Sequence, residues 1–180
     1  MIKPVFWVLL GVAVLIVAAV LLIAARQPDT FRVQRSARIA APAERIFPMI
    51  NDLRLMNGWN PFVKKDPNLK GTYTGPAGGP GATYDFQGNK EVGTGRIQIV
   101  EAVSPSRVTM KLDMTAPMQA HNDIVFSLVP EGNATQVTWS MQGPAPFLGK
   151  VMGVIFNMDR MVGSAFEQGL ANLKVRAEKA

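Results

Sequence analysis

The chain lacks most of the side chains from which catalytic and metal sites are built. Its 180 residues include no cysteine and one histidine, His121. Structural zinc sites draw on Cys and His, and no carboxylates here have the spacing of a metal-binding loop, so we expect no metal. The alternation around His121 puts it in phase with Asp123 on the solvent side of a strand, whereas a Ser-His-Asp triad would need it inside. The absence of cysteine fits either a reducing or an oxidising compartment.

Complete nucleotide-binding motifs and clustered positive charge are also absent. Gly93-x-Gly95 lacks the third glycine of a dinucleotide-binding motif and leads into a strand. Basic residues outnumber acidic ones by 19 to 13, but no basic run is longer than Lys64-Lys65. A nucleic-acid-binding protein would concentrate its basic residues on one element and interleave aromatic side chains. We therefore expect no cofactor and no nucleic-acid partner.

Charged side chains are missing from residues 5–25, an apolar run between Lys3 and Arg26. At ~1.5 Å per residue a helix of this length spans roughly 32 Å, close to the ~30 Å of a hydrocarbon core. A cleaved secretory signal is the alternative, but its apolar core is usually about 7–15 residues long and precedes a small-x-small cleavage site. Here Ile23 stands where a small residue is wanted. We predict a retained single-pass membrane anchor at residues 1–26, with the lipid bilayer as a partner.

Charges on the two flanks of this run bear on membrane orientation. Lys3 and the amino terminus precede the run, whereas Arg26, Arg32, Arg35 and Arg38 follow it. An excess of basic residues marks the cytoplasmic flank, which favours a cytoplasmic body. The last three arginines fall within the first predicted strand, however, so the side of the membrane stays open. We interpret the scattered basic surface as one that faces anionic headgroups.

After a short linker at residues 27–30, hydrophobic periodicity predicts one α+β domain at residues 31–178. A strand alternates over residues 31–39, and Pro42 and Glu44 are typical of a helix start. Two short helices should follow, then about six strands, then one long helix with an apolar stripe every three or four residues. The alternating segments lie within residues 82–87, 92–103, 108–114, 124–128 and 137–141, and the stripe runs over residues 158–173.

Several spaced motifs follow one another along this domain: Val33-x-Arg35-Ser36, Ile39-Ala-Ala-Pro42-x-Glu44-x-Ile46-Phe47, Trp59-Asn60-Pro61-Phe62, Val92-Gly93-x-Gly95, Val137-Thr138-Trp139 and Phe166-Glu167-x-Gly169-Leu170. With these motifs the domain resembles the SRPBCC or START-like helix-grip superfamily, and within it the polyketide cyclase/dehydrase and lipid-transport branch. The superfamily also includes Bet v-type allergens. The resemblance implies a curved antiparallel sheet of about seven strands wrapped around a long C-terminal helix, with a cavity between them for lipids, hormones or polyketides.

Methionines and aromatic residues on the apolar strand faces and on the final helix could line such a cavity. Methionine adapts to irregular apolar shapes, although it is also an ordinary core residue. Gly93 and Gly95 either remove volume from one strand face or mark a bulge. The predicted lining residues are Trp59, Tyr84, Phe86, Met110, Phe126, Trp139, Met141, Met158, Met161 and Phe166.

Three residues have two interpretations each. Arg35 is in phase with the inward-facing side chains, where it could hold an anionic headgroup or cap the sheet end and reach solvent; we favour the second. Trp59 could anchor the corner between the short helices and the sheet or line the cavity mouth. Tyr84 could pack in the core, where its hydroxyl needs a partner, or take part in acid–base chemistry.

The leading hypothesis is a membrane-anchored domain that binds or transports a hydrophobic small molecule, such as a lipid, an isoprenoid or a polyketide-like compound. We find no recognisable catalytic constellation, so a cyclase or dehydratase acting on a polyketide-like substrate is the alternative. A non-binding interaction module at a membrane is the third hypothesis. The oligomeric state is left open.

Overall fold

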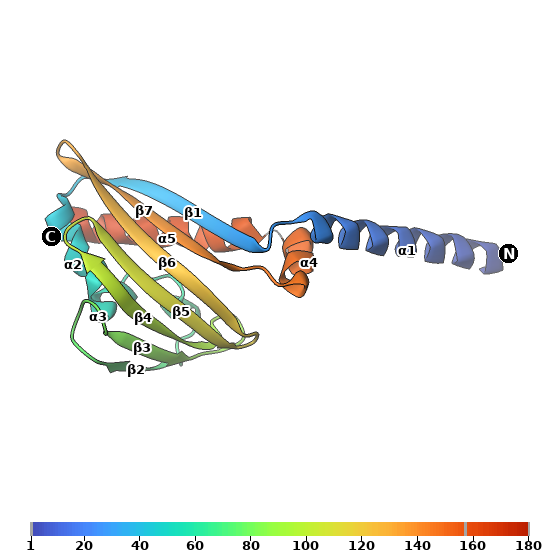
Figure 1. The fold of residues 1–180 in the computed structure, drawn as a ribbon, viewed down its shortest axis with the longest axis horizontal. Coiled ribbons are helices and arrows are strands. Elements are labelled where there is room, and N and C mark those ends of the chain that lie inside the picture. Colours follow the sequence, from blue (N-terminus) through green and yellow to red (C-terminus); the bar gives the residue numbers. More distant parts are fainter. Residues whose placement is uncertain (1, 157, 180) are drawn as a thin grey trace.

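The computed structural model describes the backbone of residues 2–156 and 158–179 and the side chains of residues 5–155 and 159–179. A curved sheet wraps around one long helix, and a second long helix projects from one end of this body (Figure 1). The helices are α1 (Ile2–Arg26), α2 (Ala43–Asn51), α3 (Leu53–Asn57), the 3-10 turn η1 (Val63–Lys65), α4 (Phe147–Phe156) and α5 (Met158–Lys179). The strands are β1 (Thr30–Ile39), β2 (Lys70–Thr74), β3 (Thr83–Gln87), β4 (Thr94–Val103), β5 (Arg107–Ala116), β6 (Ala120–Glu131) and β7 (Ala134–Pro144).

The seven strands form one antiparallel sheet in the order β1-β7-β6-β5-β4-β3-β2. Consecutive strands from β2 to β7 are neighbours, and β1 closes the order by pairing with β7 along its whole length. This topology, with two short helices after β1 and a long C-terminal helix, confirms the predicted α+β helix-grip architecture. Most of the predicted segments match strands or helices to within a few residues.

Two elements were not predicted, for different physical reasons. β2 is an edge strand in which Tyr73 alone is partly buried, so its sequence shows no apolar alternation. α4 is apolar over nearly its whole length, with one charged residue, Lys150, and therefore has no amphipathic stripe to reveal a helix.

Local signals explain where the short helices begin. Pro42 occupies the N-cap of α2 in an extended conformation, and Glu44 lies in the first turn, where a carboxylate favours the positive end of the helix dipole. Asp52 ends α2 and caps α3, because its Oδ1 accepts hydrogen bonds from the backbone N–H of Arg54 at 2.7 Å and of Leu55 at 3.3 Å.

The core lies between the concave face of the sheet and the two helices that cover it. α5 runs along β1 and β7, while α2 packs against β5, β6 and α5 (Figure 1). α5 buries a stripe at helical spacing, which explains the periodicity seen in the sequence. The buried side chains of this stripe are Phe166, Leu170, Leu173 and Ala177, and they face buried strand residues that include Val33, Ile99, Val108, Met110, Ile124, Phe126, Leu128, Val137 and Trp139.

Helix α1 stands apart from this core, and its apolar side chains are almost all exposed. Within the described part of the chain it is the one helix long and apolar enough to cross a membrane, over Val5–Arg26. A signal sequence near the N-terminus can also meet these criteria of length and composition.

Candidate ligand-binding site

Four of the predicted lining residues form a tight aromatic cluster in the middle of the core. The rings of Trp139 and Phe166 are stacked at 4.2 Å with 9° between their planes, and Phe126 lies 4.9 Å from Trp139. Trp59 meets Phe126 and Trp139 edge-on at 6.0 and 5.8 Å. All four side chains are at most 2 % exposed. Because these rings touch one another, they fill the space beneath α5 at this point and leave no room for a guest between them.

Trp59 also connects the loop after α3 to helices α2 and α5 through hydrogen bonds. Its Nε1 donates a hydrogen bond to the backbone oxygen of Met49 at 2.9 Å, at the end of α2. Its own backbone oxygen accepts one from Nδ2 of Asn172 on α5 at 3.0 Å. These contacts correspond to the anchoring interpretation of Trp59, at the corner where the short helices meet the sheet.

A second row of predicted lining residues runs along the concave face toward β2. The Tyr84 ring lies 4.5 Å from that of Tyr73 and 6.0 Å from that of Phe86, and Met110 is fully buried behind them on β5. Burial raises the pKa of the Tyr84 hydroxyl, and the neighbouring Tyr73 adds to the effect. The hydroxyl is therefore protonated at neutral pH, and it can donate a hydrogen bond but not act as a base.

The remaining predicted lining residues lie toward the end of the sheet where α1 and α4 join it. Met141 on β7 is 9 % exposed, whereas Met161 on α5 is 56 % exposed. The side chain of Met158 lies outside the described residues. The nine described residues thus do not surround one space: four fill the core, three follow the sheet, and two lie toward its open end.

The open end of the concave face carries apolar side chains that α5 does not fully cover. Phe86, Leu112 and Met114 are all half-buried there, on β3 and β5. Gly95 on β4 lies between two of them in the register, opposite Phe86 on one side and Met114 on the other. A Cβ on Gly95 would lie 3.0 Å from Sδ of Met114 and 3.1 Å from Cζ of Phe86. The missing side chain therefore lets these two residues approach each other.

Gly93 and Gly95 thus follow the bulge interpretation of the sequence. Gly93 precedes β4 and has a φ of 78°, a conformation that glycine adopts without strain. The pairing of β4 with β5 shifts its register between Thr94 and Gly95. The glycines shape the strand entry, and neighbouring side chains occupy the volume that they leave.

Two buried polar atoms of the inward-facing residues have no hydrogen-bond partner within the described chain: Nε1 of Trp139 and Oδ1 of Asn122. Asn122 follows the same alternation as Ile124 and Phe126 on β6, and its amide lies over Gly143 of β7. Buried polar groups are nearly always hydrogen-bonded, so each unpaired one calls for an explanation. The Asn122 acceptor is chemically suited to a hydroxyl group of a guest, whereas Nε1 of Trp139 lies within the closed aromatic cluster.

Arg35 is ion-paired with two carboxylates of α5. Its guanidinium bonds to Asp159 on α5, with Nη2 3.0 Å from Oδ2, and to Glu167, with Nε 2.7 Å from Oε1. The buried Gly163 lies where a Cβ would collide with this guanidinium. Hydrogen bonds from Arg35 lower the pKa of the Asp159 carboxyl. Arg35 therefore joins β1 to α5 by ion pairs at the surface, and its side chain remains 24% exposed, in agreement with the expectation that it reaches solvent.

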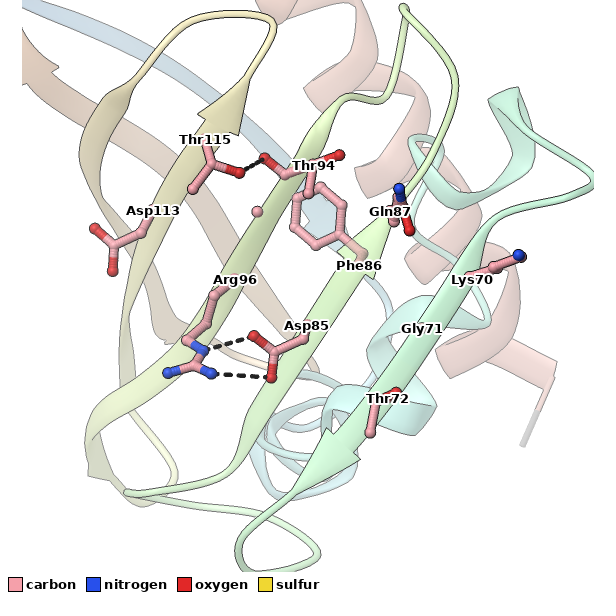
Figure 2. A pocket seen from close by; sticks show the side chains of 11 residues that line it. Lys70, Gly71, Thr72, Asp85, Phe86, Gln87, Thr94, Arg96, Asp113 and Thr115 are labelled. Carbon is pink, nitrogen blue, oxygen red and sulfur yellow. Dashed lines mark hydrogen bonds and ion pairs between the residues drawn. The ribbon is translucent and has the colours of Figure 1, made fainter.

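A pocket of about 570 Å³ lies on strands β2 to β5, and its charged lining residues were not predicted from the sequence. Figure 2 shows the side chains of Asp85 and Arg96 joined across it, with Arg96 Nε 2.7 Å from Asp85 Oδ1. Asp85 and Arg96 alternate with the inward-facing Tyr84 and Ile97, so they belong to the outer face of the sheet. Phe86 and Gly95 line this pocket too, and its four charged residues, Lys70, Asp85, Arg96 and Asp113, compensate one another, so the pocket presents no net charge to a ligand.

Comparison with known proteins agrees with this architecture. The family model described as "polyketide cyclase / dehydrase and lipid transport" matches residues 30–178. No match is found among curated proteins.

Solved structures with the same fold share little sequence with this chain. Protein CV1439 from Chromobacterium violaceum superposes with a TM-score of 0.57 at 16% identity, covering 84% of this chain and 99% of that one. The Aha1 dimer from Colwellia psychrerythraea gives 0.58 at 18% identity, over 82% of this chain and 96% of that one. BexL, a di-domain ARO/CYC protein from the BE-7585A biosynthetic pathway, gives 0.61 at 14% identity. This chain is 87% covered in that superposition and spans about half of BexL, 52%.

At these identities the solved structures establish the fold alone. The family match extends over most of the chain, from the first residue of β1 to within one residue of the end of α5. The protein belongs to the polyketide cyclase/dehydrase and lipid-transport family.

Proposed function

We propose that this protein is a membrane-anchored binding or transport protein for a hydrophobic small molecule and that it acts without catalysis. In this proposal residues 1–26 are a retained single-pass anchor, residues 27–30 a linker, and residues 31–178 the ligand-binding domain. The guest occupies the open end of the concave face, next to Phe86, Leu112 and Met114. The aromatic cluster around Trp139 forms the floor of the site.

The observation that carries the proposal is the incomplete cover over this end of the concave face. Half-buried apolar side chains keep part of their surface in contact with water. A guest that covers this surface is stabilised by about 25 cal/mol per Å² of apolar surface removed from water. Oδ1 of Asn122, the residue paired with Leu112 across β5 and β6, has no hydrogen-bond partner in the described part of the chain and offers an acceptor for a polar group of that guest. The family description, which names lipid transport, agrees with a guest of this kind.

The energetics of association set a lower limit on the size of the guest. Burying a methylene contributes about 0.8 kcal/mol, whereas association costs at least ~4 kcal/mol. Micromolar affinity needs about 8 kcal/mol net. About fifteen methylene equivalents are therefore needed without polar help, which fits a fatty chain, an isoprenoid or a multi-ring compound.

Binding of a fluorescent fatty-acyl probe to delipidated protein tests the proposal. Wild type should bind the probe at concentrations up to tens of micromolar, about 6–7 kcal/mol. Met114→Trp places a large ring at the open end and should weaken binding at least tenfold. Lys111→Trp puts the same ring on the exposed outer face of the same strand and serves as the matched control. Absence of binding by wild type, or equal binding by both variants, would contradict the site and favour a non-binding interaction module.

A cyclase or dehydratase activity is the second candidate, because one observation favours it. Tyr84 is a buried residue whose hydroxyl, with its pKa raised by burial, stays protonated and could donate a hydrogen bond to a polyketide carbonyl. Turnover of a poly-β-ketone substrate that is lost in Tyr84→Phe, with the thermal unfolding midpoint unchanged, would establish this role. Turnover that survives in Tyr84→Phe would remove Tyr84 from any catalytic step.

A further inference from the structure

Helix α4 carries an exposed apolar stripe that the protein itself does not cover. Leu148, Met152 and Ile155 are 60 %, 36 % and 56 % exposed and follow one another at i, i+4 and i+7, so they share one face of the helix. Phe147, 52 % exposed, extends the stripe at the helix start. An exposed contiguous apolar surface marks a site of contact with another molecule or a membrane.

The single charged residue of α4 points away from this stripe. Lys150 is 9 % exposed, and its Nζ lies 2.6 Å from Oδ1 of Asp29 in the linker after α1. The backbone N–H of Ala145, just before α4, donates to the backbone oxygen of Asp29 at 2.7 Å. The polar groups of this region therefore fix α4 to the linker and leave the opposite side of the helix purely apolar.

The position of α4 in the molecule identifies what covers the stripe. α4 packs against the last turns of α1 and lies beside them at the end of the sheet where β1 begins (Figure 1). Ala24 in the last turn of α1 is fully buried, whereas Leu21, Leu22 and Ile23 are 42–63 % exposed. The apolar surface of α4 thus adjoins the apolar surface of α1, at the level where the apolar run ends and Arg26 begins.

We infer that α4 lies in the boundary between headgroups and acyl chains of the same leaflet from which α1 emerges, with Leu148, Met152 and Ile155 turned toward the acyl chains. This inference rests on the proposed membrane anchor, since α1 sets the depth of α4. An amphipathic or apolar helix that lies in the interface plane buries its apolar face about 5–10 Å deep. The open end of the concave face is then held at the bilayer surface, and a lipid-like guest passes between membrane and site without crossing bulk water.

The absence of cysteine makes a direct test possible, because a single introduced thiol is the only one in the chain. The full chain with Leu148→Cys, carrying a polarity-sensitive fluorophore, is reconstituted into phosphatidylcholine vesicles with or without lipids that bear a quencher on the acyl chain. Val129→Cys is the matched control: it is apolar, 56 % exposed, and next to the β6–β7 turn, at the opposite end of the sheet from α4 (Figure 1). Leu15→Cys reports on the middle of α1.

The inference predicts a blue-shifted emission at position 148 that the acyl-chain quencher reduces at least twofold, and an aqueous, unquenched emission at position 129. Aqueous emission at 148 together with quenching at 15 would overturn the role of α4 and leave the anchor standing. Aqueous emission at both position 148 and position 15 would overturn the anchor and the inference together. A blue-shifted but unquenched label at 148 would show that a protein surface, such as a second copy, covers the stripe, and would overturn the inference.

Discussion

Trp139 is the residue on which the interior of the domain depends most. Its ring contacts Phe126, Trp59 and Phe166 and is 2 % exposed. Aromatic pairs at these distances stabilise a fold beyond the surface that they bury. Residues 59, 126, 139 and 166 therefore act first as core.

Truncation of this ring should destabilise the fold. We expect Trp139→Ala to lower the free energy of unfolding by about 3–5 kcal/mol, because a cavity replaces a fully packed side chain. Urea unfolding followed by circular dichroism measures the change. Met161→Ala, at a position 56 % exposed, should stay within ~0.5 kcal/mol of wild type. A loss below ~1 kcal/mol for Trp139→Ala would mean that the ring is not packed as described.

The ion pair between Arg35 and Asp159 makes a pH-dependent contribution to stability. The Asp159 carboxyl has a lowered pKa in the folded protein because Arg35 donates hydrogen bonds to it. A carboxyl with a lowered folded-state pKa stabilises the fold at pH values above its ordinary pKa of about 3.9, and that stability is lost as pH falls through the lowered value.

Asp159→Asn should therefore be less stable than wild type at neutral pH, and the difference should shrink as pH falls below about 4. Urea midpoints measured from pH 7 to pH 3 provide the comparison. Asp123→Asn, at an exposed position on β6, should differ little from wild type throughout. A difference for Asp159→Asn that is constant over this pH range would show that its carboxylate charge contributes nothing.

At the scale of elements, the close approach of α5 to the sheet is what fills the middle of the core. Gly169 lies where α5 crosses Trp139, and a Cβ there would lie 2.6 Å from Cζ3 of Trp139 and 3.0 Å from Cδ of Pro61. Glycine within a helix costs about 0.5–1 kcal/mol relative to alanine. This cost is offset by packing, because only glycine lets the axis of α5 lie this close to the indole ring of Trp139.

Two glycine-to-alanine substitutions separate the close approach from helix propensity. Gly169→Ala should destabilise the domain by about 1–3 kcal/mol through overpacking, despite the gain in propensity. Gly149→Ala in α4 meets nothing closer than Cδ of Pro146 at 3.5 Å and should be neutral or stabilising by up to ~1 kcal/mol. Thermal unfolding of both variants provides the comparison, and a stabilising Gly169→Ala would contradict the packing of α5 on Trp139.

The position of α5 also explains how much of the core could be predicted from the sequence. Alternation places Tyr84, Met110, Phe126 and Trp139 on one face of the sheet, and all four side chains are buried. Alternation states which face a residue occupies but not how closely the covering helix approaches. The stacking of Phe166 on Trp139 depends on how closely α5 approaches the sheet. Gly169 is the one residue in the sequence that indicates this close approach. Which residues contact a ligand therefore stays a prediction.

Helix α4 and strand β2 escaped prediction because neither buries an alternating or periodic stripe. α4 turns its apolar residues outward, toward what we infer to be lipid, so its pattern is that of a membrane-facing segment and not of a core helix. The role of Arg35 was missed because its partners Asp159 and Glu167 are 124 and 132 residues away in the sequence.

At the scale of the whole molecule, the two helices with the most exposed apolar surface, α1 and α4, lie at one end of the domain. The open end of the concave face lies at this same end, whereas α2, α3 and the C-terminus lie at the other end, where Leu55 and Val175 are single exposed apolar side chains (Figure 1). This arrangement suits a domain that exchanges an apolar guest with a bilayer.

Membrane extraction tests the anchor at this scale. The full chain should stay with membranes in alkaline carbonate, because an apolar helix of this length is stably inserted. A chain of residues 27–180 should be released into the supernatant. Intact-mass measurement of the full chain distinguishes the alternatives, since a mature protein beginning near Arg26 would identify α1 as a cleaved signal sequence.

Mass spectrometry of the organic extract from purified residues 27–180 tests most directly whether this domain binds a hydrophobic ligand. We predict an apolar compound of about fifteen or more carbon equivalents in near-stoichiometric amount, and its loss from the Met114→Trp variant but not from Lys111→Trp. An extract with no such compound, together with no uptake of a fatty-acyl probe by the same protein, would contradict the proposed function.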